Sequence, residues 1–108
     1  PREPSAGSIF KNVGFDEFKV KDLFKKFPQL SQFKEKESVP AAFLIAECGL
    51  KGKKIGGAVI SEKHSNFILN WSGRASSLDV KRLIDLAKHR VKEKFRVKME
   101  EEIHYLGF

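Results

Sequence analysis

The chain lacks several features on which large classes of protein depend. Its 108 residues include one Cys, one Met, one Trp and one Tyr. A single Cys excludes an internal disulfide framework, and no secretory signal peptide is evident. No apolar run approaches the ~20 residues that a membrane-spanning helix needs. We therefore expect a protein of the reducing cytoplasm with no membrane-spanning segment.

Apolar residues and positive charge are both plentiful. Hydrophobic residues make up 41% of the chain and include ten Phe, which is typical of one globular domain with a modest core. The formal net charge of +7 points to an anionic partner, such as a nucleic acid, a phosphate-bearing ligand or an acidic surface. The basic segment from Lys81 to Lys98 is followed by Glu100 to Glu102. Such a helix beside an acidic cluster is most often a solvated surface.

The centre of the sequence predicts a β-hairpin. Residues 56–60 and 66–71 are rich in β-branched and aromatic residues, and a polar turn from Ser61 to Ser65 separates them. The pair Gly56–Gly57 indicates that something approaches the backbone closely, and a ligand or a second domain is the expected candidate. The basic turn 51–54 before it is either a solubility feature or a phosphate contact.

Shorter elements are predicted on the amino-terminal side of the hairpin. Ser8 to Asn12 should form a strand with Ser8, Phe10 and Asn12 on one face. A helix from Lys19 should end at Pro28.

Helices should flank the hairpin in sequence. A buried helix over residues 41–48 should be capped by Ser38 and end at Gly49. The longest helix follows a capping-box spacing at Ser76 and Asp79. Its predicted buried stripe is Val80, Leu83, Ile84, Ala87, Val91 and Phe95. With a last strand over residues 102–106, we expect an α+β fold: a small, mainly antiparallel sheet with helices packed on one face.

Familiar catalytic and metal-binding patterns are missing. Ser8 has no GxSxG context, and the three His residues and the Glu cluster do not have the spacing of a zinc site, so no metal is expected. A hydroxyl at Ser8 and a carboxylate at Glu102 could flank one cleft as a proton-transfer pair, provided that their strands are neighbours.

Eight consecutive residues near the amino end carry a more specific signal: Ser5-Ala6-Gly7-Ser8-Ile9-Phe10-Lys11-Asn12. They resemble the SAGS-[FIV]-FKN signature of bacterial UDP-N-acetylenolpyruvoylglucosamine reductases, the flavoenzymes that complete UDP-N-acetylmuramate. The resemblance covers nearly the whole chain, in order and with compatible gaps. It continues through residues 40–45, 48–52, 55–58, 62–64 and 66–68, and ends at 100–103 with 106–107.

The resemblance implies that residues 7–108 are the C-terminal substrate-binding domain, after a linker at residues 1–6 from an FAD-binding domain that is missing here. In the family, NADPH reduces FAD, and the reduced flavin delivers hydride to the enolpyruvyl double bond of UDP-N-acetylglucosamine-enolpyruvate. FAD and NADPH are thus expected in the complete enzyme. Neither is expected to bind to this chain alone, which should be inactive. The expected partners are that substrate and the missing flavin domain, with no nucleic acid.

Individual roles also follow from the resemblance. The serine matching Ser8 protonates the carbon next to the substrate carboxylate, and the glutamate matching Glu102 helps to stabilise the enolic intermediate. Asn12 matches a substrate ligand of the family. Lys11, Lys63 and His64 lie in matching segments near the substrate and are further substrate-binding candidates.

Some positions depart from the family pattern. His104 occupies a position where the family usually has Arg, and segment 14–38 is longer than in many relatives. The tyrosine-bearing loop that one branch inserts is not evident, which favours the shorter, second type.

Two other classes of function remain as alternatives. A small basic nucleic-acid-binding module would use the face from Lys81 to Lys98, although no RNP, KH or zinc-finger pattern is present. A pure interaction domain would bind neither a small ligand nor nucleic acid.

Overall fold

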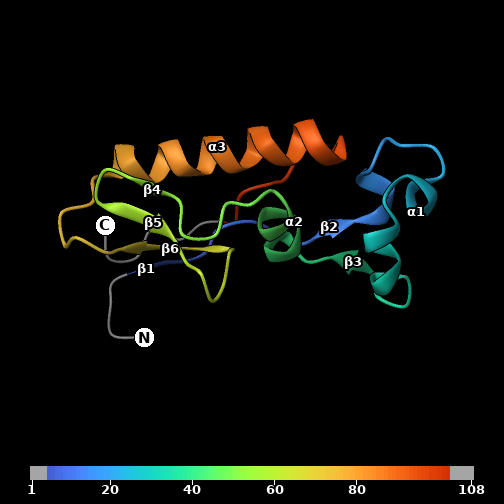
Figure 1. Cartoon of the computed structure of the whole chain (residues 1–108), viewed down its shortest axis with the longest axis horizontal. Helices are drawn as coiled ribbons and strands as arrows, with labels where there is room; N and C mark the ends of the chain where they lie inside the picture. Colours follow the sequence, from blue (N-terminus) through green and yellow to red (C-terminus); the bar gives the residue numbers. More distant parts are fainter. Residues whose placement is uncertain (1–4, 103–108) are drawn as a thin grey trace.

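The computed structural model describes residues 5–102, and over this range the fold is α+β, as the sequence predicts. A four-stranded antiparallel sheet has the strand order β1-β6-β5-β4 (Figure 1). Its strands are β1 (Ser5–Ser8), β4 (Lys54–Ile55), β5 (Ala58–Ile60) and β6 (Phe67–Asn70). A second antiparallel sheet pairs β2 (Val13–Gly14) with β3 (Ser38–Val39). The strands therefore divide between two sheets, where one was expected.

The predicted central hairpin is confirmed. β5 and β6 pair with Val59 opposite Leu69, and the polar residues 61–66 connect them. Side chains alternate between two environments because successive strand residues point to opposite faces. On one face Ala58, Ile60 and Ile68 are buried. The opposite face, which we call the open face, carries the partly exposed Val59, Phe67 and Leu69.

Helix α3 (Ser77–Phe95) covers the buried face of the sheet (Figure 1). The predicted capping box is present: the Ser76 hydroxyl accepts a hydrogen bond from the backbone N–H of Asp79 at 3.1 Å, and Asp79 Oδ2 accepts one from the N–H of Ser76 at 3.2 Å. The buried residues of α3 are the six that the periodicity predicts. Since each larger side chain contributes roughly 1.5–3 kcal/mol on burial, this stripe is a main source of the domain's stability.

The close approach predicted at Gly56–Gly57 is made by the domain itself. Asp79 Oδ2 accepts a hydrogen bond from the backbone N–H of Gly57 at 3.0 Å. A Cβ atom on Gly56 would overlap the Asp79 carboxylate, and one on Gly57 would overlap the Ser72 hydroxyl. The glycines therefore make room for the start of α3 and the preceding loop, and the expectation of a ligand or a second domain at this point is wrong.

The helix predicted from Lys19 is shorter than expected. It forms only α1 (Leu23–Lys26), and Pro28 begins a 3-10 helix, η2 (Pro28–Phe33). An earlier 3-10 turn, η1, spans Phe15–Glu17. This region joins the main core through Phe27, whose ring lies 5.1 Å from that of Phe95 between centroids.

Helix α2 (Ala41–Glu47) confirms the predicted buried helix, but its cap differs. Ser38 lies in β3 and does not cap it. Instead Asn12 Oδ1 accepts a hydrogen bond from the N–H of Ala41 at 3.2 Å, so a residue distant in sequence replaces the predicted local cap. At the other end Gly49, with φ +72°, provides the predicted left-handed exit.

The predicted alternation over Ser8–Asn12 is wrong. Ile9 and Phe10 are both buried, while Lys11 and Asn12 are both exposed. The register of β1 against β6 shifts between Ser5 and Ser8, and Phe10 then pairs with Glu101 instead of β6. Because the chain changes its strand partner within five residues, its side chains no longer alternate between two faces. His104, the predicted strand beyond residue 102 and residues 1–4 of the predicted linker lie outside the described residues.

None of the helices between residues 5 and 102 is long and apolar enough to cross a membrane.

We predict that Asp79 makes stability depend on acidic pH. The hydrogen bond from the N–H of Gly57, followed by that from Ser76, lowers the pKa of Asp79 from its ordinary value of 3.8. Its stabilising contribution is therefore complete above the unfolded pKa and is lost as the pH falls through the lower folded pKa. Asp79→Asn should lower the melting temperature by a constant amount between pH 5 and 7, and by less as the pH falls below 4.

The measurement is thermal unfolding followed by circular dichroism from pH 2.5 to 7. Asp85→Asn is the matched control, because Asp85 lies on the same helix and makes only an exposed ion pair with Lys81 at 3.9 Å. A melting-temperature difference for Asp79→Asn that does not change with pH would contradict the assignment.

Candidate functional site

The candidate site lies on the open face of the four-stranded sheet. Ser8 ends β1 with an exposed side chain and is paired with Phe67 of β6. Beside this pair is a cavity of about 950 Å³. Its lining includes Lys54, Val59, Glu62, Lys63, His64, Phe67 and Leu69. The cavity thus combines an apolar floor of strand residues with cationic and ionisable groups at its edge.

The turn between β5 and β6 places Lys63 and His64 at the cavity. The buried Ser61 hydroxyl accepts hydrogen bonds from the backbone N–H groups of Lys63 and His64, each at 3.2 Å. The N–H of Phe67 donates to the His64 carbonyl at 2.9 Å, and the two rings lie 5.7 Å apart between centroids. Since these bonds fix the backbone of the turn, both predicted substrate-binding residues are held at the cavity lining.

Asn66 joins this turn to Ser8. Its side chain is buried, and its Nδ2 donates to Ser8 Oγ and to the Phe10 carbonyl, each at 2.9 Å. Its Oδ1 accepts from the N–H of Phe10 at 2.9 Å. The position of the Ser8 hydroxyl therefore depends on a residue that precedes β6, far away in sequence.

The two ends of the described chain meet next to Ser8. The N–H of Glu102 donates to the Ile9 carbonyl at 2.7 Å, and the N–H of Lys11 donates to the Glu100 carbonyl at 2.9 Å. The segments that carry Ser8 and Glu102 are therefore neighbours, which is the condition that composition alone could not establish. Both side chains are exposed.

Lys11 and Asn12 have partners within the domain. Lys11 Nζ lies 3.8 Å from Glu100 Oε2 in an exposed ion pair, which is worth little in stability. Asn12 holds the first turn of α2 through its Oδ1. Neither residue is part of the cavity lining, so the structure groups Lys63 and His64 with the cavity and places these two candidates on the segment beyond Ser8.

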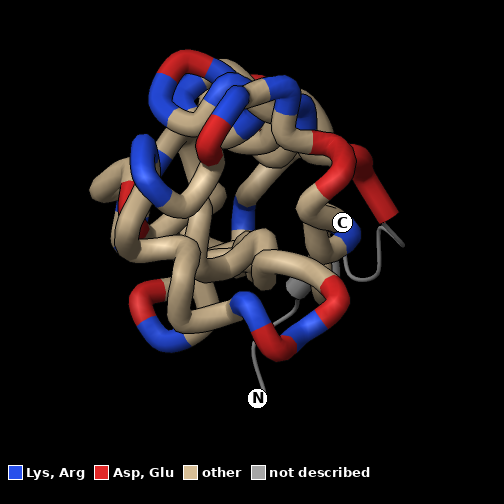
Figure 2. Tube along the Cα trace, turned by 90° about the vertical axis from the view of Figure 1, so that its right-hand side faces the viewer, with Lys and Arg blue, Asp and Glu red and all other residues tan. Residues whose placement is uncertain are grey.

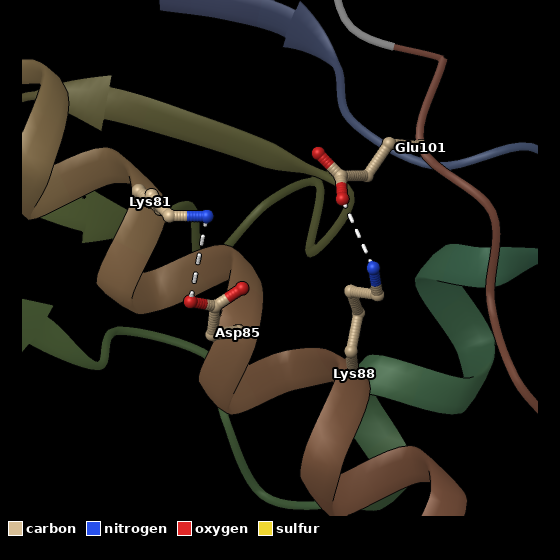
Figure 3. A network of polar contacts seen from close by, with 4 residues as sticks. All are labelled: Lys81, Asp85, Lys88 and Glu101. Atoms are coloured by element: carbon tan, nitrogen blue, oxygen red, sulfur yellow. Dashed lines mark hydrogen bonds and ion pairs between the residues drawn. The ribbon is translucent and has the colours of Figure 1, made fainter.

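Lys and Arg segments alternate with Asp and Glu segments in Figure 2, and α3 itself carries Asp79, Asp85 and Glu93 among its basic residues. Lys81 pairs with Asp85 at 3.9 Å, and Lys88 Nζ pairs with Glu101 at 3.0 Å (Figure 3). The second pair connects the C-terminal segment to α3. These contacts pair two of the basic side chains, Lys81 and Lys88, with carboxylates of the same chain.

Among the described residues, Cys48, His64 and His89 are not arranged for nucleophilic or metal chemistry. Cys48 packs partly buried beside the core, and burial raises the pKa of its thiol, which disfavours the reactive thiolate. Between residues 5 and 102, no group of three or more His, Cys, Asp or Glu side chains is arranged to hold a metal ion.

Sequence reasoning did not single out Asn66 or the pairing of Lys54 with Trp71. Lys54 Nζ lies 4.3 Å from the centre of the Trp71 ring, which is half exposed. Asn66 belongs to a segment that matches the family, but nothing local distinguishes it from other turn residues. Its partners lie 56 and 58 residues away, so only the fold shows its role.

Comparisons with known proteins agree on one family. Residues 1–106 match the family model described as UDP-N-acetylenolpyruvoylglucosamine reductase, C-terminal domain. A relative with that enzyme name from Synechococcus sp. (strain JA-3-3Ab) is 49% identical over 77 residues, covering 71% of this chain and 24% of the relative. One from Fusobacterium nucleatum is 46% identical over 108 residues, covering 92% of this chain and 38% of the relative. The chain thus spans less than half the length of these relatives.

We predict that Asn12 contributes to stability through the α2 cap. Asn12→Ala removes the acceptor for the N–H of Ala41 and should cost about 0.5–2 kcal/mol, the usual cost of losing a cap. Asn12→Asp is the matched control, because its carboxylate keeps the acceptor, and it should unfold close to the parent. Urea unfolding followed by circular dichroism measures both. Equal losses in the two variants would rule out the cap as the cause.

Proposed function

We propose a function from one premise: this chain belongs to the UDP-N-acetylenolpyruvoylglucosamine reductase family, as its C-terminal domain. The proposed function is to bind UDP-N-acetylglucosamine-enolpyruvate and to donate a proton as it is reduced to UDP-N-acetylmuramate with NADPH. This reaction belongs to the cytoplasmic synthesis of peptidoglycan precursors. Residues 7–108 are the proposed substrate domain, residues 1–6 the linker, and a separate FAD-binding domain completes the enzyme. Alone, the chain is expected to be inactive.

One observation supports this proposal most strongly: the exposed Ser8 is paired with Phe67, which lines the cavity, and the backbone of Glu102 lies against the next residue, Ile9. The segments that carry the Ser8 hydroxyl and the Glu102 carboxyl group are therefore neighbours, although they come from opposite ends of the sequence. The open face, which α3 does not cover, leaves Ser8 accessible to a group held by another domain.

Protonation by Ser8 completes the proposed reduction. The reduced flavin, when bound by its own domain, supplies a hydride to one carbon of the enolpyruvyl double bond. The π electrons then move to the carbon next to the carboxylate, which becomes strongly basic. A C–H bond forms there as the O–H bond of Ser8 breaks, and the resulting alkoxide regains a proton from water. The basicity of the carbanion lets a hydroxyl as weakly acidic as that of serine act as the acid.

Glu102 is the proposed stabiliser of the enolic intermediate. An ionised carboxylate would repel the negative charge that develops there. A protonated carboxyl group, or one that shares a hydrogen bond with the intermediate, would disperse that charge. We therefore propose that Glu102 acts as a hydrogen-bonding acid once substrate and the flavin domain enclose it.

The cavity is the proposed site for anionic parts of the substrate. Lys54, Lys63 and His64 line it together with one carboxylate, Glu62, so positive groups outnumber negative ones, and the chain's net charge of +7 attracts a diphosphate. Lys11 and Asn12 are kept as further ligands on the family resemblance. The α2 cap uses only the Oδ1 atom of Asn12, so the amide nitrogen can donate to a substrate oxygen.

We predict that Ser8→Ala separates the two half-reactions in the complete reductase, with this chain joined to a family flavin domain. NADPH should still bleach the flavin at the parent rate. Reoxidation by the enolpyruvyl substrate should slow by about 10²- to 10⁴-fold, the usual contribution of a positioned general acid. Stopped-flow absorbance of the flavin measures both steps. The control is Ser77→Ala, at an exposed serine that begins α3. Rapid reoxidation in Ser8→Ala would remove Ser8 from this role.

We predict that Lys63→Met weakens substrate binding more than catalysis. Loss of one charged hydrogen bond should raise the KM for the enolpyruvyl substrate about ten- to a hundredfold, with a smaller change in kcat. Lys92→Met is the matched control, since Lys92 is an exposed lysine on α3, away from the cavity lining. Steady-state kinetics at fixed ionic strength distinguish the variants, and equal KM values for both would contradict a substrate contact by Lys63.

A further inference from the structure

The orientation of the Asn66 side chain is determined by its backbone partners. The N–H of Phe10 can only donate, so the atom that faces it, 2.9 Å away, must be the amide oxygen. The carbonyl of Phe10 can only accept, so the atom that faces it must be the amide nitrogen. The same nitrogen faces Ser8 Oγ at 2.9 Å. Its two protons therefore serve Phe10 and Ser8.

This orientation determines which way the hydrogen bond to Ser8 runs. An amide N–H has no lone pair to accept a proton, so Asn66 must donate and Ser8 Oγ must accept. One lone pair of the serine oxygen is thereby occupied, and the serine's own proton is left for another acceptor. Ser8 is exposed on the open face, so that acceptor can come from outside the domain.

The same bond favours the product of proton transfer. When Ser8 gives up its proton, negative charge develops on Oγ, and a donor that is already in place stabilises it. Asn66 is buried and held by two bonds to Phe10, so it need not reorganise as the charge forms. A buried amide is suited to this task because it donates without carrying a charge of its own.

We propose that Asn66 is a positioning residue for Ser8: its amide nitrogen holds the serine oxygen as an acceptor, keeps the serine proton available to the substrate, and stabilises the alkoxide that follows. The inference rests on the proposed function and assigns to it a residue outside the predicted catalytic and substrate-binding set.

The first test is Asn66→Asp in the complete reductase. The carboxylate has nearly the same shape and still accepts from the N–H of Phe10. The oxygen that replaces Nδ2 cannot donate to the Phe10 carbonyl or to Ser8 Oγ, and it accepts the Ser8 proton where the amide donated. Flavin reduction by NADPH should be unchanged, and reoxidation by substrate should slow at least tenfold. Asn70→Asp is the matched control, because Asn70 ends β6 and its Oδ1 accepts from the N–H of Ala75, a role that Asp retains. It should reoxidise at the parent rate.

A double-mutant cycle separates positioning from a purely structural role. In a Ser8→Ala background the hydroxyl is gone, so adding Asn66→Asp should slow reoxidation by less than twofold. An equal slowing by Asn66→Asp with and without the Ser8 hydroxyl would overturn the proposal, because the effect would then not pass through Ser8.

The hydrogen bond itself can be tested without turnover. In ¹⁵N-labelled chain, Ser8→Ala should shift the Asn66 side-chain amide resonances and speed their exchange with solvent. Unchanged resonances would refute the contact, whatever the enzyme does. No reoxidation by substrate in the unmodified complete protein would refute the proposed function. Normal reoxidation in both the parent and Asn66→Asp would refute the positioning role alone.

Discussion

The structure around the site depends on how two consecutive buried residues satisfy their backbone groups. Ile9 and Phe10 both face the core, and neither continues a regular strand. The backbone of Ile9 bonds to the Asn66 carbonyl and the Glu102 N–H, while both backbone groups of Phe10 bond to the Asn66 side chain. Each unpaired buried group would cost about 1–3 kcal/mol, so the turn before β6 and the C-terminal segment are both held to this point.

The placement of Ser8 and Glu102 follows from that constraint. Ser8 precedes the buried pair in the chain, and Glu102 lies across from it. Helix α3 adds support from the other side of the domain, because Asp79 holds Gly57 at the hairpin entry and Lys88 pairs with Glu101 near the chain's end. The sheet is thus packed on one face and open on the other. The packed face provides stability, while the open face leaves polar groups accessible.

Local patterns predicted the parts of the fold that local interactions determine. The stripe of α3 and its cap at Ser76 follow from spacing within one helix, and the hairpin follows from two adjacent apolar runs. The predictions failed where a partner distant in sequence decided the outcome. Asn12, not Ser38, accepts the hydrogen bond at the start of α2. The side chains after Ser8 do not alternate between two faces, because the chain pairs with β6 at Ser8 and with Glu101 at Phe10. For the site, a family resemblance indicated Ser8. The hydrogen bond from Asn66 that orients its hydroxyl joins residues 58 apart in sequence, so only the folded structure reveals it.

The segment from Ser8 to Asn12 also shows why a matching motif does not by itself identify catalytic residues. Four of its five residues have a structural task that would explain their presence: Ile9 and Phe10 fill the core, Lys11 faces Glu100, and Asn12 caps α2. Ser8 differs, because its side chain is exposed and its oxygen accepts a bond from a buried amide. Asn66 is buried where it satisfies both backbone groups of Phe10, and its bond to Ser8 is an additional contact that no buried backbone group requires. That additional bond holds the exposed hydroxyl in one orientation, which is what the proposed proton donation needs.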